Sequence, residues 1–209
     1  MRQPRAVCAV AGFTAAVCLV LTGCDRTPAN EPGVDYSELG VPVPSPSGRY
    51  ATPDPKVKSP GDNASPSEQV LFDLQQRVVR TAGVAAPTTA TCAGGVITGT
   101  VDQSVDCAVV YQGLRVTYRV EITGGTPTFS WVATTEKSVL TAEGVGRAYW
   151  AKYGAEATAV RCDKMPQKRL VRLGEDTDFR CYHEGPGGWT EHAVLLKDGG
   201  INFESTEPA

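Results

Sequence analysis

The chain has 209 residues, of which 41% are hydrophobic and 21% charged, and a formal net charge of −3 at pH 7. These values are typical of a soluble globular protein. Because nucleic acids and anionic membrane surfaces favour a basic protein, the charge balance argues against either as the main partner.

The N-terminus has the three parts of a bacterial secretory signal. Arg2 and Arg5 precede an uncharged apolar run over residues 6–21, which is short for a membrane span. The tetrapeptide 21–24, Leu-Thr-Gly-Cys, follows and resembles the lipobox of bacterial lipoproteins. The resemblance implies that palmitate-type acyl chains are attached through the sulfur of Cys24 and that residues 1–23 are removed. An uncleaved signal anchor, or an ordinary signal followed by an incidental cysteine, is the alternative.

This signal predicts the location of the mature chain. The acyl chains would hold it on the extracytoplasmic face of the cytoplasmic membrane. Asp25, directly after the lipid-bearing cysteine, resembles a signal for retention at that membrane. Loss of Arg2 and Arg5 leaves 18 of the 20 basic residues against 23 acidic ones, so the mature chain carries a formal charge of −5.

Residues 24–66 are predicted to form a disordered tether. Nine of the fifteen prolines lie between Asp25 and Pro66, among few large apolar side chains. Such a segment buries too little surface to offset the entropy of ordering it. Mostly extended, it would reach on the order of 100 Å, which suits a spacer, although a linker without a selected length has the same composition.

The first folded half is predicted to begin with a helix. Ser65 suits its N-cap, Pro66 its first position and Glu68 a capping box, and Gly83 can end it. Strands are predicted next, over residues 88–92, 105–111 and 114–120, followed by one that carries Phe129 and Trp131. The alternation of apolar and polar residues is clearest over 114–120.

The same order then restarts. A helix capped by Ser138 or Thr141 would end at Gly154, followed by strands that lead to Cys162 and that cover 177–182, 189–196 and 201–203. Cys92 and Cys162 are 70 positions apart, whereas the later landmarks are 74 or 75 apart, so one insertion of about four residues aligns the halves.

The sequence therefore predicts an α+β fold of two tandem units. Each unit, 67–137 and 138–209, would pack one helix on an antiparallel sheet of about four strands with one disulfide. The alternative is a single domain in which the matching glycines and cysteines are coincidental.

Four cysteines remain after the signal and the lipid have used Cys8, Cys18 and Cys24. An even set in an oxidising compartment indicates disulfides. Three pairings exist, and the repeat favours the one that is the same in both units: Cys92–Cys107 and Cys162–Cys181. Redox or zinc chemistry is disfavoured because the chain has no Cys-x-x-Cys.

The order of helix, glycine and paired cysteines resembles a family of actinobacterial lipoproteins whose globular domain has no known function. The resemblance covers about 67–205 as two copies and implies an actinobacterial source. The family has Cys-Pro at its first cysteine, where this chain has Cys92-Ala93 and Cys162-Asp163. The second copy, with Gly174 before Phe179-Arg180-Cys181, follows the family pattern more closely. The layout is also similar to the secreted inhibitor of β-lactamase from streptomycetes.

No motif indicates catalysis, a metal or a cofactor. His183, on the same strand face as Cys181, is expected to be a surface or half-buried residue, and neither it nor His192 has a candidate nucleophile nearby in the sequence. The acidic residues 175, 176 and 178 lack the spacing of a calcium loop. Trp150 and Trp189 are candidate contact residues, and so are four basic residues of one predicted loop: Lys164, Lys168, Arg169 and Arg172. A charge-balanced loop facing Glu175 and Asp176 is the alternative for the basic group.

The function expected from these features is that of a non-catalytic binding or interaction module of the cell envelope. Its partners would be the membrane, through the acyl chains, and an envelope protein or cell-wall polymer, with no nucleic acid and no cofactor. A passive structural envelope protein, or an enzyme with a site at the junction of the repeats, are the alternatives.

Overall fold

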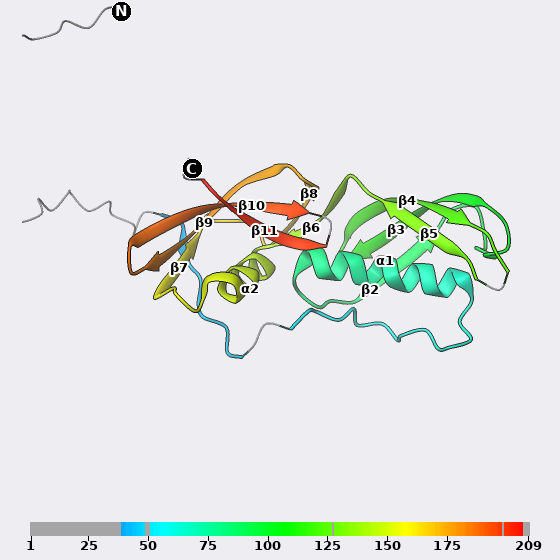
Figure 1. Cartoon of the computed structure of the whole chain (residues 1–209), viewed down its shortest axis with the longest axis horizontal. Coiled ribbons are helices and arrows are strands. Elements are labelled where there is room, and N and C mark those ends of the chain that lie inside the picture. The colour runs from blue at the N-terminus through cyan, green and yellow to red at the C-terminus, as the bar shows by residue number, and fades with distance from the viewer. Residues whose placement is uncertain (1–38, 49–50, 127, 198, 207–209) are drawn as a thin grey trace, which may run out of the picture. The chain divides into compact units, whose positions relative to one another are not determined.

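The computed structural model describes residues 39–48, 51–126, 128–197 and 199–206, all of which belong to one compact unit. This part of the chain has an α+β fold with two helices, antiparallel sheets and two disulfides (Figure 1). No described helix is both long and apolar enough to cross a membrane. The proposed signal and Cys24 lie outside the described residues.

Helix α1 (Pro66–Ala82) packs on a four-stranded sheet. The strands are β2 (Thr88–Cys92), β3 (Gln103–Tyr111), β4 (Leu114–Thr123) and β5 (Ser130–Thr134), in this order and all antiparallel. The predicted capping box is confirmed, because Ser65 and Glu68 bond each other's backbone N–H. Gly83 ends the helix in the left-handed conformation, with φ of 71°. Alternate β4 side chains are buried, as the sequence predicts.

Helix α2 (Ala142–Tyr153) packs on a five-stranded sheet. Its strands run in the order β1 (Val41–Pro42), β7 (Ala159–Cys162), β9 (Asp176–Gly185), β10 (Gly188–Lys197) and β11 (Gly200–Ser205). Of the two predicted N-caps, Thr141 is the one used: its side chain accepts the Gly144 N–H at 2.9 Å. Ser138 instead bonds Thr81 of α1 at 2.6 Å.

The two predicted disulfides are confirmed. Cys92 is joined to Cys107 and Cys162 to Cys181, each pair directly opposite on neighbouring strands. At both disulfides the backbone N–H of the residue after the first cysteine donates to the carbonyl oxygen of the residue before the second cysteine. These bonds run from Ala93 to Asp106 and from Asp163 to Arg180.

A third sheet departs from the prediction of two. β6 (Lys137–Thr141) pairs with β8 (Lys168–Arg172) as a two-stranded ribbon, and β8 lies where the sequence predicts a loop. The ribbon forms because apolar side chains on both of its faces are buried, since neighbouring side chains of a strand point in opposite directions. Val139 and Leu170 pack on the first core, whereas Leu140 and Val171 pack on the second.

The halves also meet where α1 ends and α2 begins. A Cβ on Gly144 would lie 2.1 Å from the carbonyl oxygen of Ala82, so no larger residue fits between the two backbones. The Thr141 hydroxyl donates to the same carbonyl at 2.6 Å. The ribbon and this contact hold the two cores together.

The segment 39–48 corrects the prediction of a wholly disordered tether over 24–66. We call this segment the strap. Its strand β1 pairs antiparallel with β7, with Val41 opposite Cys162, and it adds a fifth strand to the second sheet. Composition alone predicts disorder because the apolar surface and hydrogen-bond donors that order the strap belong to residues far along the chain.

Candidate functional site

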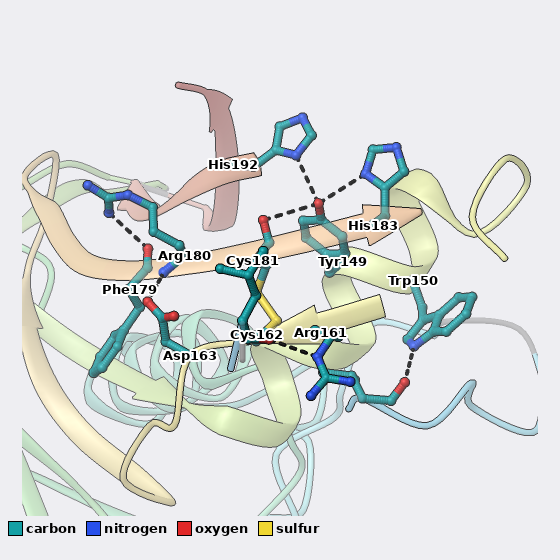
Figure 2. Close-up of a disulfide and its surroundings, with 12 residues drawn as sticks. Tyr149, Trp150, Arg161, Cys162, Asp163, Phe179, Arg180, Cys181, His183 and His192 are labelled. Atoms are coloured by element: carbon teal, nitrogen blue, oxygen red, sulfur yellow. Dashed lines mark hydrogen bonds between the residues drawn. A yellow bond between two sulfur atoms is a disulfide. The ribbon is translucent and has the colours of Figure 1, made fainter. Parts of the chain in front are cut away.

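Beside the Cys162–Cys181 disulfide lie a buried group of polar side chains and a tryptophan that contacts the strap (Figure 2). Two consecutive residues of α2, Tyr149 and Trp150, point to different sides of the helix there. The Tyr149 hydroxyl lies between two histidines, and Trp150 points away from them toward the strap. Helix α2 therefore contacts a buried polar cluster with one residue and the strap with the next.

The Tyr149 hydroxyl has three polar neighbours. It lies 2.8 Å from Nδ1 of His192, 3.1 Å from Nδ1 of His183 and 3.4 Å from the carbonyl oxygen of Cys181. A hydroxyl has one proton and two lone pairs. All three contacts are hydrogen bonds only if both imidazoles donate from Nδ1 and the hydroxyl donates to the carbonyl. On this basis we assign a proton to Nδ1 of both rings.

Both histidines are buried, with 7% of His183 and 6% of His192 exposed, which corrects the expected surface or half-buried position of His183. The ring of Tyr153 stacks on His183 with centroids 4.9 Å apart and lies 4.4 Å from His192. Strand alternation could have found this placement. His183 lies two residues from buried Cys181 and His192 two residues from buried Val194, so each shares an inward face.

Burial favours the neutral forms of His192 and Tyr149. Removal from water, with smaller electrostatic contributions from His183 and Lys152, lowers the pKa of His192 to about 4. Burial raises the pKa of the Tyr149 hydroxyl, with smaller contributions from Tyr153 and Glu156. No carboxylate bonds the three side chains, and the described residues hold no group of three or more metal-ligating side chains. The Tyr149 hydroxyl is thus the centre of a buried hydrogen-bond network that includes both histidines.

The strap is held by specific groups of α2 and β7. Trp150 Nε1 donates to the carbonyl of Val43 at 3.0 Å, and the Val43 N–H donates to the carbonyl of Val160 at 2.9 Å. Arg161 donates to the carbonyls of Leu39 and Gly40 at 2.8 and 3.1 Å. Trp150 and Arg161 thus donate to main-chain carbonyls of the strap, so the contacts recognise an extended backbone.

Two glycines make room for the strap. A Cβ on Gly146 of α2 would lie 2.7 Å from a methyl of Val43, and a Cβ on Gly40 would lie 2.1 Å from the carbonyl oxygen of Cys162. Gly40 also has a φ of 62°, which other residues rarely adopt. A larger residue at Gly40 would push the strap off the sheet edge because it meets backbone, and one at Gly146 would do so unless the Val43 side chain changes with it.

A groove remains between the strap, the start of α2 and the loop after Cys162. Its volume is about 610 Å³, within the range of small-ligand sites. Apolar strap residues line one side, and Glu143, Arg147, Lys164 and Met165 line the other. This is the concave surface that the fold builds beside the second disulfide.

The six candidate contact residues divide among separate environments. Trp150 binds the strap, and Trp189 lies opposite Glu184 at the start of β10. Of the basic residues only Lys164 lines the groove, and the other three belong to β8 rather than to a loop. Lys168 donates to the carbonyl of Gln112, Arg169 lies 5.3 Å from the ring of Phe179, and Arg172 pairs with Glu175 at 3.4 Å.

Comparisons of the chain with protein-family models, curated protein sequences and solved structures found no match. The resemblance to actinobacterial lipoproteins therefore stays a prediction from the residues quoted above.

Trp150→Phe is expected to loosen the strap without unfolding the second half. The variant keeps the aromatic ring but loses the N–H that binds Val43, a bond worth about 1 kcal/mol. The Val43 amide should then exchange with solvent roughly five times faster, as measured by hydrogen exchange. Trp189→Phe is the matched control and should leave that rate unchanged. Equal rates in both variants and in the parent chain would show that the indole does not hold the strap.

Proposed function

We propose that this chain is a lipoprotein anchored to the extracytoplasmic face of the cytoplasmic membrane, whose folded part is a non-catalytic binding module of the cell envelope. The observation that carries the proposal is the tetrapeptide 21–24 ending at Cys24, placed directly after a charged and then an apolar segment. Two disulfides support it, since such bonds persist in exported proteins and are rare in the cytosol.

We infer further that the two halves, 67–137 and 138–209, are tandem copies of one unit. Each has a helix, a cysteine-bearing strand and a second cysteine on the next strand of the same sheet. The equivalent bonds from Ala93 to Asp106 and from Asp163 to Arg180 support this inference. The strap and the ribbon would then be additions, one extending the second sheet and one joining the copies.

A binding role is favoured over catalysis because the two histidines and Tyr149 are buried and bonded within the fold rather than placed in a cavity. Both histidines are buried and bond the Tyr149 hydroxyl, and four surface cavities of the described residues are lined by other side chains. The groove beside the strap offers a concave surface to an envelope protein or wall polymer. Crosslinking in intact cells separates this role from that of a passive envelope protein, because only a binding module yields one reproducible partner.

Cys24→Ala is expected to abolish lipid attachment. In a bacterial host fed an alkyne-tagged palmitate, the parent chain should carry the tag and sediment with membranes, because acyl chains hold it there. The variant should carry no tag. Cys18→Ala, which changes a cysteine within the apolar run, is the control and should remain tagged. A tag that survives Cys24→Ala would refute the assignment of the lipid to this sulfur.

A further inference from the structure

The surface that holds the strap recognises a short extended segment. We call it the strap-binding surface and define it by Gly146 and Trp150 of α2 and Val160 and Arg161 of β7. Three of these residues bond main-chain groups of the strap, and the fourth leaves space for the Val43 side chain. The recognition is therefore of strand backbone plus one β-branched side chain, the usual mode in which a strand adds to a sheet edge.

The strap can leave this surface without opening either core. Val41 is 45% exposed, Pro42 is exposed, and Val43 is half-buried. Both hydrophobic cores are otherwise built from residues of α1 onward, with Val43 only at the periphery of the second. Sheet edges of this kind open locally at lower cost than the whole fold.

The chain that joins the strap to α1 does not force the two to stay in one molecule. The described residues 51–64 form no helix or strand, and prolines and glycine interrupt them. A strap from a second copy would make the same contacts. Whether the surface holds its own strap or that of another copy therefore depends on the effective concentration of each. A short linker between two binding segments sets an effective concentration on the order of 1 mM within one molecule.

We propose that neighbouring copies exchange straps: the residues 39–48 of one copy add to β7 of another, whose own strap does the same in return. The occupant is a second copy because the strap is the one segment whose fit to this surface is observed. Exchange between anchored copies rests on the proposed lipid anchor, since confinement to a membrane supplies the local concentration that competes with the linker. Reciprocal exchange closes a two-fold dimer.

Two singly substituted chains test the exchange. Val43→Cys places a thiol on the strap of one chain and replaces the methyl that a side chain at position 146 would meet. Gly146→Cys places the second thiol on the strap-binding surface of the other chain, where the two Cβ atoms would lie 3.9 Å apart, a separation that suits a disulfide. Both also carry Cys24→Ser, so the experiment in solution does not depend on the anchor. After mixing and mild oxidation, a disulfide-linked dimer of the two chains is expected on a non-reducing gel, increasing as the total concentration approaches 1 mM.

The control pairs Gly146→Cys with Val132→Cys, a thiol on β5 at a position that is 63% exposed. The strap pair should exceed this pair in dimer yield several-fold. A chain with both Val43→Cys and Gly146→Cys should close within itself and stay monomeric. Equal yields from the two mixed pairs would overturn strap exchange, and that result would leave the palmitate test of Cys24 unaffected.

Discussion

Leu140→Ala should lower the free energy of unfolding by about 3 kcal/mol and should affect both halves of the fold together. Leu140 is 2% exposed and packs on the second core, and truncation of such a leucine leaves a cavity that costs 2–5 kcal/mol. The adjacent residue Val139 packs on the first core from the other face of the same strand. Loss of the Leu140 packing should therefore destabilise the ribbon, and with it both cores that pack on the ribbon.

Urea unfolding in two backgrounds measures this. One background retains only Trp131, which packs on the first core, and the other retains only Trp150, which packs on the second. Both fluorescence transitions should move to lower urea by the same amount, as one cooperative unit requires. Val132→Ala, at an exposed position, is the control and should change stability by less than about 0.5 kcal/mol. A shift of the Trp150 transition alone would show that the halves unfold independently.

Local signals in the sequence account for most elements of the fold. The capping box at Ser65 and Glu68 and the alternation along β4 each depend on residues close together in the chain. Both can be predicted because propensity, capping and burial agree there. The cysteine pairing was also predicted, and it depends on a comparison of the two halves rather than on either alone.

The missed elements depend on distant partners. β8 has cationic residues at three of its five positions and resembles a loop until Leu170 and Val171 are known to face two different cores. The strap is a Pro-rich segment whose order depends on Trp150, 107 positions further along the chain. No local pattern contains that contact, so composition alone predicts disorder for the strap.

The Tyr149 cluster was missed for a different reason. A lone histidine on a strand is usually a surface residue, and the two histidines are nine positions apart on different strands. They meet because the turn between β9 and β10 sets a register in which Cys181 lies opposite His192. Hydrogen bonds from both rings to one hydroxyl then become geometrically available.

The folded chain should lose about 3 kcal/mol of stability between pH 6.5 and pH 4 because of His192. Its pKa is about 4 in the folded chain and 6.5 when unperturbed, as in the unfolded chain. Between these values the unfolded chain binds more protons, so the free energy of unfolding falls as the pH falls. The contribution is complete above pH 6.5 and is lost at pH 4, and each pKa unit is worth about 1.4 kcal/mol.

His192→Asn isolates this contribution. The asparagine amide can donate to the Tyr149 hydroxyl from near the position of Nδ1 but does not titrate, so the free energy of unfolding should depend about 3 kcal/mol less on pH over this range. Tyr149→Phe should lower stability at pH 7 yet retain the pH dependence, because burial is the main cause of the lowered pKa. Urea unfolding at intervals from pH 7 to pH 4 measures both variants. If His192→Asn loses stability in acid as steeply as the parent chain, another group must carry the acid sensitivity, and His192 would not be the neutral core residue that its burial implies.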